Sequence, residues 1–243
     1  MKYNFKLLVT PDKPLPMPPL REIGTHYTTD KTMPHLEALI TLRRRAAYHQ
    51  KRLNSCLDDP LIDTLKRNLL RNFDTDSISA YWDRMSPLME IIDAELIAMM
   101  QALHSQYDVF AQVINAEIIN SSPNDVYYKR INKKLTKFPD LKLVIENIKG
   151  HEHFRYLDDL INTNKHIFTP RIESDINGIY LMDDISIESF DRNNTSHAET
   201  RIRFMSHDLK SWVDSSLKRL SDSLKSCQIT VLEQKKKNSM SSF

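Results

Sequence analysis

The segment from His151 to His166 holds the densest group of side chains that can carry out chemistry. On a helix, steps of three and four residues place on one face Glu152, Arg155, Asp159, Asn162 and His166. Histidine can accept or donate a proton near neutral pH, and arginine and asparagine can hold a phosphate group. The spacing therefore fits acid–base chemistry on a phosphorylated substrate. It also fits a structural helix, in which Arg155 pairs with Asp159 and the last two polar residues cap the helix end.

The end of this segment has a recognisable pattern. The run Asn162-Thr-Asn-Lys-His166 closes a helix that follows a long helical region. In this context it resembles the signature of HEPN-type helical proteins, in which a polar residue, often Asn, lies four residues before a histidine. It also resembles a degenerate, mostly uncharacterised branch with an Asn-x-x-Lys-His motif. Many members of the superfamily are metal-independent ribonucleases of toxin–antitoxin and antiphage systems, whereas others only bind nucleotides or nucleic acid.

The resemblance assigns roles to individual residues. It implies His166 as the acid or base that promotes attack of a ribose 2′-hydroxyl on the adjacent phosphate, and Asn162 as its polar partner. The family's arginine position is occupied by Ile161. Under the resemblance, Arg155, two turns earlier, would be the substitute cation. Lys165 would contact the phosphate. In active members the site lies in a cleft between two subunits, so the resemblance also implies a homodimer.

A second polar group, Gln106-Tyr107-Asp108, interrupts the apolar pattern of a long predicted helix. Tyr107 and Asp108 can face the 151–166 helix and orient His166 through a hydroxyl or a carboxylate. The alternative is a buried hydrogen-bonding position or a helix edge. Together with the motif, this gives a predicted set of binding residues: Lys165, Asn164, Asp159, Tyr107 and Asp108.

Aromatic and basic residues mix in the stretch Tyr127-Tyr128-Lys129-Arg130, followed by Lys133-Lys134. Such a mixture suits contact with an RNA backbone, since aromatic rings stack on bases and cations neutralise phosphates. The alternative is a solvated helix face. RNA or a nucleotide is therefore the predicted partner.

Composition excludes several classes of site. With only 3 glycines in 243 residues, no glycine-rich phosphate loop can form. The two cysteines form no CxxC pair, and His151 and His153 do not share a helix face, so we expect no metal. We expect no cofactor either. The formal net charge of +2 does not indicate a membrane or nucleic-acid partner by itself. Without a signal peptide or membrane span, the chain is expected to be cytoplasmic.

Apolar periodicity and proline positions predict the helices. A Pro-rich extended arm covers residues 1–33. The predicted helices then span about 34–54, 60–72, a short segment around Trp82 capped by Asp74 or Asp76, 87–119 after a restart at Ser86-Pro87, 125–136, 139–148 and 151–165. Gly150 is placed just past the end of the helix before the motif.

The last third of the chain has a different residue pattern, which begins with β-type residues. Asn177-Gly178 between β-type residues predicts a hairpin at about 167–190. Asp191 to Thr195 is a predicted loop. A capping box from Ser196 to Glu199 then starts a helix with a near-heptad seam to about 232, which can seal the bundle or join two subunits. Residues 233–243 are predicted to be disordered.

The predicted fold is mainly α: a single helical bundle domain with long antiparallel helices over 34–232, carrying the Pro-rich arm and a small β-hairpin insertion. Two functions remain open. The first is a HEPN-like protein that binds RNA, or cleaves it without metal, in a defence or toxin–antitoxin setting. The second is a non-catalytic helical interaction protein that acts through dimerisation or partner binding, with a degenerate motif.

Overall fold

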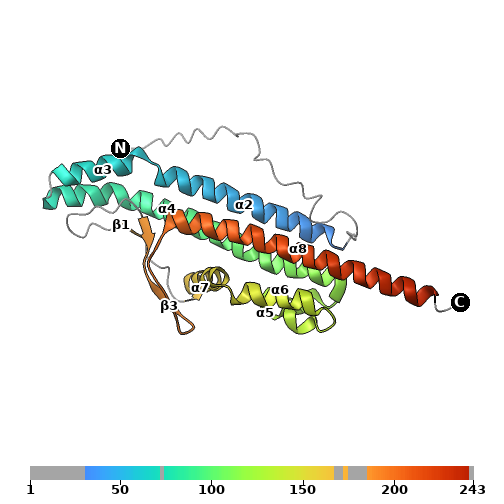
Figure 1. Ribbon diagram of the computed structural model, residues 1–243. Helices are drawn as coiled ribbons and strands as arrows, with labels where there is room; N and C mark the ends of the chain where they lie inside the picture. Colours follow the sequence, from blue (N-terminus) through green and yellow to red (C-terminus); the bar gives the residue numbers. More distant parts are fainter. Residues whose placement is uncertain (1–30, 72–73, 167–171, 175–184, 241–243) are drawn as a thin grey trace.

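Three long helices form the body of the protein. The computed structural model describes residues 31–71, 74–166, 172–174 and 185–240. Helices α2 (Met33–Leu57), α4 (Thr75–Ile114) and α8 (Ile202–Met240) lie side by side, with α2 antiparallel to the other two (Figure 1). Helix α3 (Pro60–Arg71) packs on the first turns of α4. The predicted mainly helical bundle is confirmed. The predicted arm at 1–33 lies almost entirely outside the described residues.

Helix α4 is one continuous helix of 40 residues, so the predicted restart at Ser86-Pro87 is wrong. The Asp74 side chain caps its start by accepting from the Ser77 amide at 2.7 Å. Pro87 removes one backbone hydrogen bond, but it lies on the exposed side of the helix. Buried Met85 and Leu88 on either side hold the helix against the core, and this packing keeps it continuous.

The end of α4 departs from α geometry. Residues Asn115–Ile119 form a π-helical turn, which ends at Asn120 in the left-handed conformation with φ 58°. The predicted helix over 125–136 is instead a 3₁₀ turn at Pro123–Asp125, the short α5 (Tyr128–Ile131) and a second 3₁₀ turn at Asn132–Lys134.

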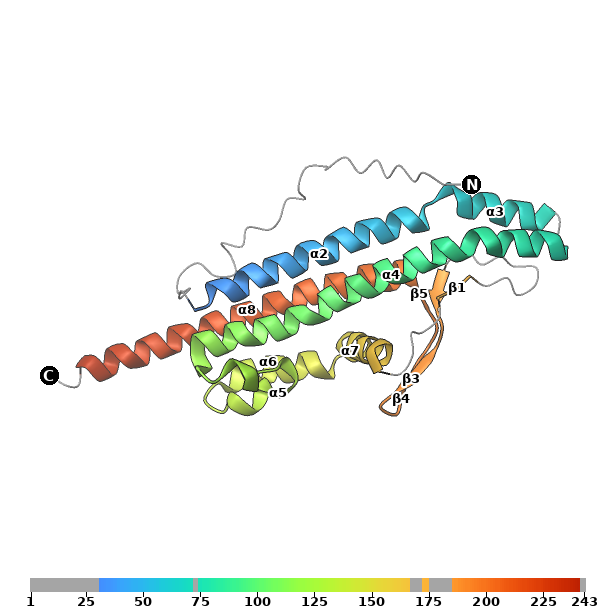
Figure 2. The ribbon, with the colours of Figure 1, turned by 180° about the vertical axis from the view of Figure 1, so that it is seen from behind.

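Helices α5, α6 (Pro139–Gly150) and α7 (Glu152–His166) form a second layer. In both views α4 and α8 lie between this layer and α2 (Figure 2). Gly150 is the last residue of α6 and does not lie beyond the helix, because His151 in extended conformation ends it. The predicted helix at 151–165 is confirmed as α7. Its layer packs on α4 and α8, so residues of α7 can meet both helices.

Between α7 and α8, the described residues form five short strands. Strand β1 (Ile172–Ser174) pairs antiparallel with β2 (Ile185–Ile187), which also pairs with β5 (Thr200–Arg201). This agrees with a hairpin at 167–190, although its Asn-Gly turn lies outside the described residues. Strands β3 (Phe190–Arg192) and β4 (Thr195–His197) form a second hairpin.

The second hairpin overturns two predictions. The predicted loop after Asp191 is a two-residue turn, in which Asn193 and Asn194 have φ 51° and 60°, the geometry of a type I′ hairpin. The predicted capping box is wrong, because Ser196 lies in β4 and α8 begins only at Ile202. The carboxylate of Glu199 instead accepts a hydrogen bond from the Ser186 hydroxyl of β2.

The seam of α8 seals the bundle. Its apolar residues from Ile202 to Cys227 recur at steps of three and four and are buried against the other helices. At the middle of the molecule, three rings from different helices pack together: Tyr107 lies 4.9 Å from Tyr128 and 5.2 Å from Phe154, centroid to centroid. Helix α8 continues to Met240, through most of the segment predicted to be disordered. Among the described residues, no helix is long and apolar enough to cross a bilayer.

Candidate functional site

Helix α7 carries the predicted motif, and its apolar side fixes its orientation. Phe154, Leu157, Leu160 and Ile161 are all buried. Ile161, which stands at the family's arginine position, is only 1% exposed. An arginine at position 161, which the resemblance to HEPN-type proteins would call for, would therefore point into the core.

Asn162 is engaged within its own helix. Its amide nitrogen donates to the backbone oxygen of Asp158 at 2.6 Å and to the Asp158 carboxylate at 3.0 Å. Both bonds span one helical turn. The amide therefore orients the Asp158 carboxylate, and its donor capacity is used before any ligand arrives.

Asp158 is the centre of a polar cluster between three helices. Its carboxylate accepts from His104 Nε2 of α4 at 2.9 Å and from Lys129 Nζ of α5 at 2.7 Å. Burial alone would raise the pKa of this carboxyl, but the bonds from His104 and Lys129 outweigh it and hold the pKa below its usual value. Asp158 is thus an ionised structural partner at neutral pH.

The neighbouring Asp159 points to the strands. Its carboxylate accepts from His197 Nε2 of β4 at 3.0 Å and from Asn193 Nδ2 at 2.9 Å. Asp159 is 5% exposed, so it cannot contact a bound ligand directly in this structure. Arg155 is exposed and does not pair with it. Asp158 therefore bonds α7 to the helical bundle on one side, and Asp159 bonds it to the β3–β4 hairpin on the other.

Tyr107 and Asp108 also have structural partners. The buried Tyr107 hydroxyl lies 2.6 Å from Ser216 Oγ of α8. Burial raises the pKa of this phenol above its usual value, although the bond to Ser216 opposes the shift, so Tyr107 is neutral and is no general base near pH 7. Asp108 Oδ1 accepts from the Tyr128 amide at 3.0 Å and so fixes the start of α5.

The remaining motif residues occupy the last turn of α7. Asn164 is half-buried. The backbone of Lys165 and His166 completes the helix, and the side chains of both residues lie outside the described part of the chain. The predicted catalytic role of His166 therefore stays a prediction. The structure brings Asn162 into contact with Asp158. Tyr107, Asp108 and Asp159 each contact a different partner, so these three predicted residues do not form one site.

Sequence reasoning missed His104, Lys129 and His197 as the partners of the two aspartates. The Asp158-Asp159 doublet was a signal that two carboxylates face different directions on α7, because adjacent residues on a helix lie about 100° apart. Nothing local marks the partners, which lie 54 and 38 positions away for the two histidines. In the described ranges, no group of three or more His, Cys, Asp or Glu residues could hold a metal ion.

The comparisons with known proteins give no relative. No protein-family model, no curated protein and no solved structure significantly matches the chain.

Proposed function

We propose that this chain is a helical RNA-binding protein, similar in kind to the non-catalytic HEPN-like proteins, in which binding and not cleavage is the activity. Two of the predicted site residues, Asn162 and Asp159, are bonded into the fold, which argues against a catalytic role for them. The proposal itself rests on a different part of the second layer, the basic segment 127–137.

The basic segment concentrates positive charge on the surface. The segment contains no acidic residue, and the nearest acidic residues along the chain are Asp125 and Asp140. It contains five cations: Lys129, Arg130, Lys133, Lys134 and Lys137. All of them are exposed except Lys134, which is half-buried. Tyr127 is 52% exposed, whereas Tyr128 is buried in the core, so only the first tyrosine can stack on a base.

The charges of this segment also extend onto α6. The Lys149 ammonium donates to the backbone oxygen of Lys129 at 2.7 Å. Burial lowers the pKa of Lys149; Glu146 opposes the shift, and the nearby charges of Lys129 and Lys133 add to it. The Lys149 ammonium thus lies beside the cations of the basic segment, and a polyanion bound along this surface would meet both.

Binding of labelled oligouridine over a range of salt concentrations tests the proposal. Each phosphate contact contributes a slope of about −0.7 to the logarithmic salt dependence for a single strand. The triple variant Arg130→Gln, Lys133→Gln, Lys137→Gln should therefore make the negative slope less steep by about 2 and weaken binding roughly tenfold or more at low salt. The matched control, Arg44→Gln, Arg45→Gln, Arg84→Gln, removes three exposed cations from α2 and α4.

The control should bind like the wild type. Equal losses in both triple variants would show non-specific attraction, and absence of binding by the wild type would refute the proposal. RNA cleavage in EDTA by the wild type, abolished in His166→Ala, would establish the catalytic hypothesis in its place.

A further inference from the structure

Three rings gather where α7 begins beside α8. The His151 imidazole stacks on the Trp212 indole at 4.9 Å, and His153 stacks on it at 5.7 Å. The two imidazoles are 5.0 Å apart. These three distances form a nearly equilateral triangle, so both imidazoles lie on the same side of the indole. Tyr107, at 6.1 Å, anchors Trp212 to the aromatic core.

Hydrogen bonds fix the orientation of His151. Its Nδ1 accepts from the backbone amide of His153 at 3.2 Å, and its carbonyl accepts from the Arg155 amide at 3.1 Å. His151 therefore serves as the N-cap of α7. Because Nδ1 is the acceptor, the neutral ring carries its proton on Nε2, which remains as a donor. The residue is exposed, so this donor can meet a ligand.

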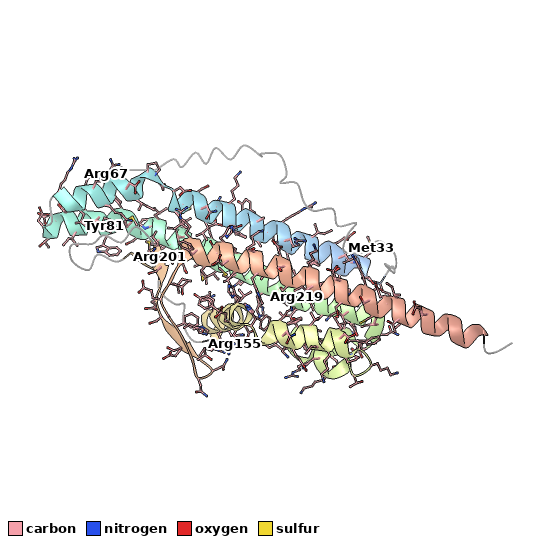
Figure 3. The ribbon with its side chains drawn as sticks, viewed as in Figure 1. Met33, Arg67, Tyr81, Arg155, Arg201 and Arg219 are labelled. Atoms are coloured by element: carbon pink, nitrogen blue, oxygen red, sulfur yellow. The ribbon has the colours of Figure 1, made fainter. Side chains whose placement is uncertain are left out.

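Two arginines stand near this ring without carboxylate partners. Arg155 lies one turn after His151 on the same face of α7, and Arg219 lies two turns after Trp212 on α8. Figure 3 labels Arg155 on α7 and Arg219 on α8. Both are exposed, and neither forms an ion pair within the part of the chain that the structure describes. Burial lowers the pKa of His151, His153 adds to the shift while Glu152 opposes it, and the charges of Arg219 and Arg155 lower it further. Arg155 and Arg219 thus add two positive charges beside His151, against the one negative charge of Glu152.

We propose that His151, Arg155 and Arg219 form a binding site for a phosphate group of an RNA chain, beside the indole of Trp212. The donors match the ligand, because two guanidinium groups and an imidazole N–H can bond several phosphate oxygens at once. The identity of the ligand as RNA rests on the proposed function, whereas the phosphate site itself does not. The site follows the end of α6, whose Lys149 contacts the basic segment, so one strand can reach both.

Trp212 provides the readout. The chain has two tryptophans, and in the full-length Trp82→Phe background only Trp212 emits tryptophan fluorescence. This protein is titrated with inorganic phosphate, with uridine 3′-monophosphate and with oligouridine, at constant ionic strength. A charge-assisted hydrogen bond contributes about 1.5–3 kcal/mol, so Arg155→Gln and Arg219→Gln should each weaken binding roughly tenfold to hundredfold. The control Arg67→Gln, on α3, should change nothing (Figure 3).

His151→Asn separates binding from folding. Asparagine keeps an N-cap acceptor for the His153 amide but removes the Nε2 donor, so α7 should stay intact while phosphate affinity falls. Unchanged phosphate affinity in the arginine variants would overturn the site. Two results would show that the ligand is not RNA. In the first, the arginine substitutions weaken the binding of inorganic phosphate but leave the affinity for oligouridine unchanged. In the second, the mononucleotide binds more tightly than oligouridine.

The two proposals fail differently. Loss of oligouridine binding only in the basic-segment variant would leave the proposed function standing and refute this site as part of it. No oligouridine binding by the wild type, with arginine-dependent phosphate binding, would refute the proposed function and keep the phosphate site.

Discussion

Replacing Asp158 by alanine tests whether the polar residues of α7 are structural. The substitution removes the acceptor shared by His104, Lys129 and Asn162. The His104 side chain is 17% exposed and the carboxylate 12%. Removing one partner of such a pair costs about 1.5–3 kcal/mol. The Lys129 side chain is 52% exposed. A pair of this kind contributes about 0–1 kcal/mol. We expect Asp158→Ala to lower the free energy of unfolding by about 2–4 kcal/mol.

The sign of the pH dependence follows from the depressed pKa of Asp158. The stabilisation is fully present above the pKa of the unfolded state, about 3.9 for an aspartate, and is lost as pH falls through the lower folded pKa. The gap between wild type and Asp158→Ala should therefore be largest near neutral pH and shrink below about pH 4.

Urea unfolding followed by circular dichroism measures this gap. A double-mutant cycle with His104→Ala should give a coupling energy of about 1–2 kcal/mol. Lys129→Met, which removes the exposed partner alone, should cost less than about 1 kcal/mol. A loss below about 0.5 kcal/mol for Asp158→Ala, or an equal loss at pH 3 and pH 7, would refute the reasoning.

Three further substitutions probe the fold. Pro87→Ala should stabilise the protein by about 1–3 kcal/mol in urea unfolding, since it restores an exposed mid-helix hydrogen bond; destabilisation would mean that the proline is needed for the shape of α4. Tyr107→Phe should cost about 1 kcal/mol, because the Ser216 hydroxyl loses its bond to Tyr107 and keeps its bond to the Val213 carbonyl; a neutral result would show that the Tyr107–Ser216 bond is not formed. Asn194→Val should cost about 1–3 kcal/mol in thermal unfolding, whereas Asn194→Gly should be neutral or stabilising, because φ is 60° there; equal effects would contradict the turn geometry.

Local signals in the sequence were sufficient for the helices whose ends they mark. Prolines in the first turn and apolar steps of three and four placed α2, α3, α6 and α7 within a few residues. The same rules failed at Pro87, because burial on both sides of it outweighs one missing hydrogen bond. They also failed at Ser196, where a local capping pattern lost to strand pairing and to the contact of Glu199 with Ser186.

The sequence alone determined which chemical groups α7 carries, and only the tertiary structure decided their partners. Spacing placed Asp159 and Asn162 on one polar face of the helix. It could not show which residues of other elements contact that face. His104 and His197 come from α4 and β4, and they turn adjacent aspartates into two separate structural contacts. Likewise, Trp212 contacts the start of α7, and the charge of Arg219 lowers the pKa of His151, only because α8 lies beside α7. The contacts of a polar side chain depend on distant residues, and periodicity along one segment carries no information about them.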